Sequence, residues 1–198
     1  MTNKAVVPIV EGQAEVESVP ILLRRIFIEF NAYRLEVARP FRVKRNRIVR
    51  PDELERAIQQ SIRSRPNACG IIVLLDADDD CPAILGPQLL NRCRSTTQLP
   101  ATAILANREL ECWFLGAKES LRGIRGISSD ATAPHDPEGI RGAKERLQQN
   151  MQGRRYLGVD DQPALAEGMD MKKARTRCPS FDKFFREVES LISQLMTD

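Results

Sequence analysis

The chain has 198 residues, which matches one ordinary domain of about 100–200 residues. Its composition, 42% hydrophobic and 29% charged, excludes an intrinsically disordered protein. The net charge of +3 does not by itself mark a nucleic-acid-binding protein, and no apolar stretch approaches the ~18 residues that a membrane span needs.

The cysteine and histidine content argues against a zinc protein. The chain has five cysteines and one histidine, and no two cysteines form a C-x-x-C pair. Buried thiols in a reducing compartment are the simpler interpretation. We therefore expect a cytoplasmic protein with no membrane partner.

The first half of the chain alternates short apolar runs with amphipathic stretches. The pattern predicts strands at residues 5–10, 33–37, 70–75 and 101–105, and helices after residue 12, from Pro51-Asp52 and over residues 82–94. Strands that alternate with helices over short connections indicate an α/β fold, with a mostly parallel sheet flanked by helices. We assign residues 1–120 to this Rossmann-like core.

The second half is expected to be a helical extension, residues 121–198, that packs on the core. Helices are predicted over residues 108–117 and 136–151, from about residues 160–163, and from Pro179-Ser180 to the end. Residues 116–135, rich in Gly, Ser and Pro, predict a long surface loop. Trp113 lies on an apolar stripe and is expected in the core.

Two acidic clusters follow predicted strands. Glu11 and Glu15 come after the first strand, and the run that contains Asp76, Asp78 and Asp80 comes after the strand at 70–75. If these strands are neighbours, Glu11, Asp76 and Asp78 converge at the edge of the sheet where α/β proteins bind ligands. Carboxylates without histidine or thiolate favour Mg²⁺ or Mn²⁺. The alternative is that the acids cap helices or face solvent in turns.

These residues carry a resemblance. The string Val7-Pro-Ile-Val-Glu11-Gly-Gln-Ala-Glu15, followed by Ile72-Val-Leu-Leu-Asp76-Ala-Asp78, resembles the Toprim domain of type IA topoisomerases, bacterial primases and the overcoming-lysogenization-defect nucleases. The segments Ala106-Asn-Arg-Glu-Leu-Glu111-Cys-Trp113-Phe-Leu and Pro179-Ser-Phe-Asp-Lys-Phe184 are similar to an uncharacterised Toprim-like family of bacteria. Members of that family often lie beside ATPase genes in defence loci.

The resemblance implies roles for individual acids. Glu11, Asp76 and Asp78 would be the catalytic residues and would hold Mg²⁺, with Glu15 and Asp80 as candidates for a second metal. Glu111 matches an acidic position of the family whose role is open. The implied chemistry is metal-assisted displacement at phosphorus.

Basic residues form two groups that are candidates for contacts with phosphates. Residues 39–50 contain Arg42, Lys44, Arg45 and Arg47 and no acid, and a second group includes Lys172 and Lys173. A solvated basic face is the alternative for both.

We therefore expect a Mg²⁺- or Mn²⁺-dependent nuclease of a bacterial antiviral defence or DNA-processing system. It would act on nucleic acid, with DNA favoured, beside an ATPase partner. A non-catalytic Toprim-type module that binds nucleic acid or protein is the alternative. A phospho-acceptor receiver domain is a weaker one, because the lysine it needs after the last strand is not evident.

Overall fold

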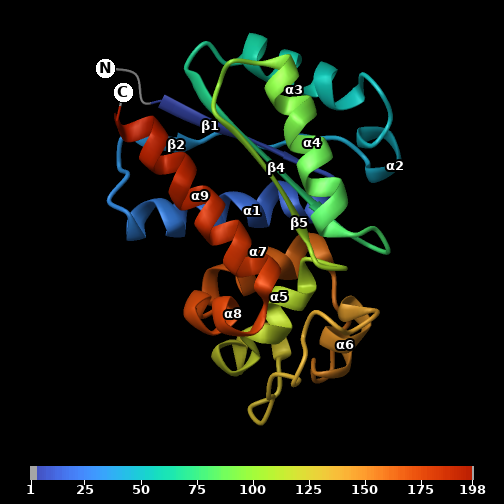
Figure 1. The fold of residues 1–198 in the computed structure, drawn as a ribbon. Helices are drawn as coiled ribbons and strands as arrows, with labels where there is room; N and C mark the ends of the chain where they lie inside the picture. Colours follow the sequence, from blue (N-terminus) through green and yellow to red (C-terminus); the bar gives the residue numbers. More distant parts are fainter. Residues whose placement is uncertain (1–3, 198) are drawn as a thin grey trace.

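The structure is a computed structural model that describes residues 4–197. Within that range a sheet of five parallel strands lies between layers of helices (Figure 1). The strands are β1 (Lys4–Val10), β2 (Leu35–Val37), β3 (Phe41–Arg42), β4 (Ala68–Asp76) and β5 (Ala101–Ala106). The parallel α/β fold flanked by helices, predicted from the sequence, is confirmed.

The helices alternate with the strands in the first half and follow one another in the second. They are α1 (Gln13–Glu29), α2 (Arg45–Ile48), α3 (Glu53–Ser64), α4 (Pro82–Thr96), α5 (Glu111–Gly116), α6 (Ala143–Gln149), α7 (Gly158–Gly168), α8 (Met171–Arg177) and α9 (Pro179–Thr197). Two short 3-10 helices, η1 (Lys118–Leu121) and η2 (Ile124–Gly126), lie between α5 and α6. No helix of the described residues is long and apolar enough to cross a membrane.

The strand order places the two acidic segments side by side. The sheet has the order β2-β1-β4-β5, and β3 pairs with the last residues of β1. Val10 at the end of β1 is in register with Leu74 of β4. Because β1 and β4 are parallel neighbours, their carboxyl ends meet at one edge of the sheet, and the segments that follow them begin beside each other.

Alternate strand residues build two separate cores. Val6, Val10, Ile72 and Leu74 face a layer that contains α1, α5 and α9, whereas the intervening residues face α3 and α4. Trp113 is fully buried in the first core and stacks on Phe184 with 5.2 Å between ring centroids. The expectation that Trp113 belongs to the core is confirmed, and α9 from the second half packs directly on β4 and β5.

The helix predicted over residues 136–151 is wrong in its first half. The Asp136 carboxylate accepts a hydrogen bond from the backbone N–H of Gly139 at 2.9 Å, so Asp136-Pro137 closes a turn and starts no helix. Helix α6 begins only at Ala143, after Gly142 in the left-handed region (φ +69°). The predicted surface loop 116–135 also needs correction, because it contains η1 and η2 and buries Leu121 and Ile127.

Two basic segments are more structured than the sequence indicated. Residues 39–50 contain β3 and α2, and Lys172 and Lys173 lie on helix α8, which we did not predict. Local periodicity is weak in such short elements, and tertiary contacts decide their conformation. The strand predicted at 33–37 is shorter and begins at Leu35.

Candidate active site

The carboxyl edge of the sheet gathers acidic side chains from three parts of the chain. Glu11 directly follows β1, Asp76 is the last residue of β4, and Glu111 begins α5. The pKa of Asp76 is raised by burial and by the charges of Glu111 and Glu11, which places these three carboxyl groups in one electrostatic cluster. We expected Glu11 and Asp76 to converge if their strands were neighbours, and the structure brings them together.

Asp76 is the most constrained member of this cluster. Its side chain is buried, and Oδ1 accepts a hydrogen bond of 2.7 Å from the backbone N–H of Leu110. The Nζ atom of Lys144 lies 4.0 Å from the other oxygen, Oδ2. Burial and neighbouring carboxylates raise the pKa of Asp76 well above its usual range, while Lys144 acts in the opposite direction. A further cation would relieve the cost of ionising this group.

Glu11 lies between its acidic neighbours and an arginine. Burial and the charges of Glu15 and Asp78 raise the pKa of Glu11 to about 7, although Arg45 opposes them. The Nε atom of Arg45 is 3.9 Å from Glu11 Oε2 and 3.9 Å from Asp78 Oδ2, and its guanidinium forms an ion pair with Asp80. Pairing of β3 with the end of β1 brings α2, and with it Arg45, to this position.

Three carboxylate oxygens of the site are buried and have no hydrogen-bond partner. They belong to Glu11, Glu15 and Glu111, and the Nε and Nη1 atoms of Arg45 are in the same state. Glu15 folds back over Gly12, where a Cβ atom would overlap its Oε2 atom. Glycine at position 12 thus leaves space for the Glu15 carboxylate at the start of α1. Buried polar atoms without partners are uncommon in native proteins and indicate a missing ligand or water.

Glu111 is fully buried but only half satisfied. Its Oε1 atom accepts hydrogen bonds from the Tyr156 hydroxyl and the Gln162 side-chain amide, each at 2.9 Å, while Oε2 accepts none. Burial raises the pKa of Glu111, against the opposing effects of Lys144, Gln162 and Tyr156. Glu111, whose role the sequence left open, is therefore part of the acidic cluster.

Lys144 is the main residue of the site that sequence analysis missed. Its Nζ atom lies 3.8 Å from Glu111 Oε2, 3.8 Å from Glu109 Oε2 and 4.0 Å from Asp76 Oδ2. Burial works to lower the pKa of Lys144, but the surrounding carboxylates outweigh it and raise the pKa. No local motif marks Lys144. Helix α6 is fixed here because the Glu109 carboxylate accepts a hydrogen bond from the Ala143 N–H at 3.0 Å.

The aspartates after β4 are divided between the cluster and the surface. Asp78 adopts the left-handed conformation (φ 51°), as does Arg108 after β5 (φ 62°), and the N–H of Asp78 donates to the carbonyl of Arg108 at 2.9 Å. Asp79 points to the surface and pairs with Arg141 at 2.7 Å. Asp80 is exposed and meets the cluster through Arg45. Non-glycine residues in the left-handed region cost free energy and cluster at functional sites.

A cleft of about 650 Å³ opens beside the carboxylates. The start of α1 forms one wall and α6 the other, with Glu15, Glu111, Lys144 and Tyr156 among its lining residues. A cavity of this size is within the usual range for small-ligand sites, about 300–1,000 Å³. Glu15 and Glu111 line the cleft, and their buried oxygens without hydrogen bonds lie beside it.

The carboxylates fit a hard divalent ion by chemistry but do not form a ready cage. Among residues 4–197, no three His, Cys, Asp or Glu side chains are arranged so that they could hold a metal ion. The unpartnered oxygens are nevertheless the donor type that Mg²⁺ and Mn²⁺ prefer. In this arrangement Lys144 and Arg45 supply the positive charge that offsets the negative charge of the carboxylates.

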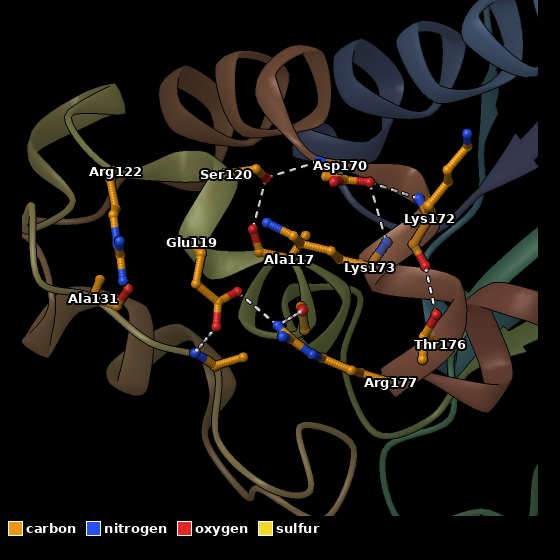
Figure 2. A network of polar contacts seen from close by, with 12 residues as sticks. Ala117, Glu119, Ser120, Arg122, Ala131, Asp170, Lys172, Lys173, Thr176 and Arg177 are labelled. Carbon is orange, nitrogen blue, oxygen red and sulfur yellow. Dashed lines mark hydrogen bonds and ion pairs between the residues drawn. The ribbon is translucent and has the colours of Figure 1, made fainter.

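The two predicted basic groups lie far apart. Arg42 on β3, Lys44 just before α2 and Arg47 on α2 are exposed, whereas Arg45 turns inward. Figure 1 shows α2 and α8 on opposite sides of the molecule. Figure 2 shows how α8 is fixed: the Asp170 side chain accepts hydrogen bonds from the backbone N–H groups of Lys172 and Lys173. Neither lysine lines the cleft beside the acidic cluster.

The fold and this site define a class: a parallel α/β protein with a cluster of buried carboxylates at the carboxyl edge of its sheet. Two solved structures share the fold. The C-terminal region of the Burkholderia pseudomallei OLD protein matches 94% of this chain and 98% of its own, with a TM-score of 0.50 and 16% identity. The corresponding region of the Xanthomonas campestris pv. campestris OLD protein matches 98% of both chains, with a TM-score of 0.51 and 16% identity.

The family is shown by sequence. The family model described as "Domain of unknown function (DUF4276)" matches residues 10–189, and the chain belongs to this family. A search of the curated proteins found no match. At 16% identity the likeness to the OLD proteins shows the fold alone, so the assignment of this domain to the Toprim class stays a prediction.

Proposed function

We propose that the protein is a Mg²⁺- or Mn²⁺-dependent phosphodiesterase that cleaves nucleic acid, with DNA the favoured substrate. The observation that carries the proposal is the set of buried, unpartnered carboxylate oxygens of Glu11, Glu15 and Glu111 beside Asp76. A cluster with raised pKa values in an open cleft is typical of a functional site. The shared fold with the OLD C-terminal regions supports a nuclease-like function.

Glu11, Asp76 and Asp78 would hold the ion, and Glu15, Asp80 and Glu111 would be available to a second one. A bound divalent ion would supply an activated water and would neutralise charge on the phosphate oxygens. The hydrogen bond from the Leu110 N–H keeps Asp76 Oδ1 in place, which leaves Oδ2 for a ligand. The Tyr156 and Gln162 hydrogen bonds orient Glu111 in the same way.

Lys144 and Arg45 would contact the substrate phosphate. Both cations already lie among the carboxylates, and Arg45 has two buried nitrogen atoms without hydrogen-bond partners. Guanidinium groups bind phosphate oxygens through paired N–H donors. Once the carboxylates have an ion to neutralise them, the freed donors of Arg45 would face the incoming phosphate.

The exposed residues Arg42, Lys44 and Arg47 would extend this contact along the nucleic-acid backbone. We also propose an ATPase partner and a role in bacterial antiviral defence. These two proposals rest on the sequence resemblance and not on any residue of the site.

The proposal is tested by measuring Mn²⁺ binding by electron paramagnetic resonance and nicking of supercoiled plasmid with Mg²⁺ or Mn²⁺. We expect Asp76→Asn and Glu11→Gln to lower cleavage by at least about 10³-fold, whereas Asp79→Asn, in the same loop but turned to solvent, keeps activity. Cleavage that survives in both site variants would contradict the proposal.

A second candidate is a non-catalytic module that binds nucleic acid or protein. The absence, within the described residues, of a ready set of three metal-binding side chains favours it. The same assays separate the two candidates. Metal binding without cleavage would point to a missing partner or substrate, and absence of both would favour the non-catalytic module.

A further inference from the structure

A groove runs along the free edge of the sheet, away from the acidic cluster. Two adjoining hollows of about 580 and 400 Å³ form it, and they share Leu90, Arg94 and Glu187. Strand β5 is its floor, and the helices α4 and α9 are its walls, as their positions on either side of β5 in Figure 1 indicate. The groove therefore exposes the outer backbone edge of β5.

The backbone of β5 is paired on one side only. The carbonyls of Pro100 and Ala106 accept hydrogen bonds from β4 and the residue after it, each at 2.9 Å, so the even-numbered residues direct their backbone groups toward β4. By the alternation of a strand, Ala101, Ala103 and Leu105 direct theirs outward. Among residues 4–197, no group donates to or accepts from these outward N–H and C=O groups.

Among the described residues, this outward row of backbone groups meets a hydrogen-bond partner only where β5 has ended. The N–H of Asn107 donates to the Ser180 hydroxyl at 3.0 Å, at the start of α9. Ala103 and Leu105 are 5% and 3% exposed, so their backbone groups lie at the bottom of the groove. Backbone groups that no protein group satisfies at this depth are available to the backbone of a partner.

We propose that the groove binds an extended segment of a partner protein, which adds to the sheet as a strand beside β5. The open donors and acceptors repeat every second residue, about 6.6–6.8 Å apart, and the backbone of an extended chain matches that repeat. A helix satisfies its own backbone and would leave the row unpaired.

A second copy of this chain does not fit as the occupant through its own β5. In each copy β5 lies between α4 and α9, so pairing through β5 would press the α4 and α9 walls of one copy against those of the other, which disfavours this arrangement. The smallest lining residues of the α4 wall are Ala83 and Gly86, so the wall leaves most room for a single strand there. A Cβ atom added at Gly86 would be in van der Waals contact with the Ala103 carbonyl oxygen at 3.8 Å, so a larger side chain at this position would enter the groove.

The charges of the groove favour an acidic residue on the guest. Arg94 is exposed on α4 and has no ion pair within the described residues, while Lys183 and Glu187 on the α9 wall pair with each other at 2.7 Å. Glu138 also lines the groove, but it is buried and accepts hydrogen bonds from Asn107 and Ser180, so the unmatched charge at the exposed rim is positive. The expected guest alternates small apolar residues with polar ones and places a carboxylate opposite Arg94.

The experiment uses a panel of fluorescein-labelled peptides of alternating valine and threonine, with one aspartate or, as a control, one lysine. Binding to the full chain is measured by fluorescence anisotropy, and amide hydrogen exchange is followed by NMR. We expect the aspartate peptides to bind more tightly, and the amides of Ala103 and Leu105 to exchange at least about tenfold more slowly in the complex. The readout does not involve cleavage, so it is independent of the proposed function.

Variants test whether the peptide binds at the outer edge of β5. Ala103→Pro removes an outward N–H without touching the ladder to β4, and Gly86→Leu fills the groove from α4 without changing β5. Each is expected to weaken binding at least about tenfold. Arg94→Glu should reverse the preference between the aspartate and lysine peptides, and Arg63→Glu on α3 should leave it unchanged. If Ala103→Pro does not fold, Gly86→Leu and peptides N-methylated at alternate residues decide.

The inference is overturned if no peptide of the panel binds below about 1 mM. It is also overturned if binding is unchanged by Gly86→Leu and N-methylation, or if the protected amides lie outside β5.

Discussion

Two fully buried acids of this protein differ in how they are satisfied. Asp161, in the first turn of α7, accepts hydrogen bonds from Arg154 at 2.7 Å and from the backbone N–H of Leu157 at 2.8 Å, one on each oxygen. Glu111, at the sheet edge, has both of its hydrogen bonds on one oxygen and none on the other. Both side chains are 0% exposed, so burial alone does not separate a structural acid from a functional one.

A buried carboxylate can bind a ligand only if one of its oxygens is not already hydrogen-bonded within the protein. Asp161 is neutralised and bonded within its own segment, and nothing remains for a ligand to satisfy. Glu111 has an oxygen without a hydrogen bond that faces Lys144, and the charges of Glu111 and Glu11 raise the pKa of Asp76. The contrast predicts first that the two acids differ in how much their removal costs the free energy of unfolding.

The largest effect is expected from breaking the satisfied acid. Asp161→Ala leaves Arg154 and the Leu157 N–H without their buried partner, and we expect a loss of about 3–5 kcal/mol in the free energy of unfolding. Burial raises the pKa of Glu111, which means that its negative charge is costly to bury. Glu111→Gln removes this charge, so the free energy of unfolding should stay within about 1 kcal/mol of wild type or rise. Urea denaturation of both variants measures the difference. Equal losses would refute the contrast.

The second effect is a dependence of stability on pH. The pKa of Glu11 is 4.5 in the unfolded chain and about 7 in the folded one, so the folded state holds the proton more tightly. Stability should therefore fall as the pH rises from 4.5 to 7, on the order of 1–3 kcal/mol from this group. The raised pKa of Asp76 acts in the same direction.

Thermal unfolding across this pH range, with Glu11→Gln beside the wild type, tests the dependence. The variant should show a shallower slope, because it has no proton to lose at this position. Added Mg²⁺ should recover stability near pH 7 in the wild type only, if the carboxylates bind it. A wild-type stability that increases from pH 4.5 to 7 would contradict the electrostatic description of the cluster.

A smaller effect concerns the inward arginine. Arg45→Gln removes a positive charge about 4 Å from the Glu11 and Asp78 carboxylates, and we expect Mn²⁺ affinity to rise about fivefold. Arg47→Gln, on the same short helix but paired with Glu53, is the matched control. Unchanged or weaker Mn²⁺ binding in Arg45→Gln would show that Arg45 does not compete with the ion.

The smallest effect separates the two basic groups. Replacing Arg42 or Lys44 by glutamine should lower the slope of log affinity for DNA against log salt by about 1 for each phosphate that the variant no longer binds. Lys172→Gln and Lys173→Gln should leave the slope unchanged, because α8 lies on the other side of the molecule from α2. Equal effects from both groups would indicate that nucleic acid wraps around the whole chain.

Much of the fold and part of the site were accessible from the sequence. The apolar runs that end in Glu11 and Asp76 identified two buried strands, and the parallel sheet follows from their alternation with helices. The start of the last helix at Pro179 was also predicted. Short elements, and elements held by distant residues, were not predicted. Helix α6 begins where the distant Glu109 accepts a hydrogen bond from the Ala143 N–H, and β3 forms because it pairs with β1.

The amino-acid pattern alone was enough to identify the acids that follow the central strands, and their order. Strand periodicity is local, and parallel neighbours bring their carboxyl ends together. The three-dimensional contacts were needed to show that Glu111 turns into that edge and that Arg45 and Lys144 provide its positive charge. They also showed that Asp161 is hydrogen-bonded elsewhere. These contacts join residues more than thirty positions apart, or depend on which oxygen a hydrogen bond occupies, and no local pattern encodes either.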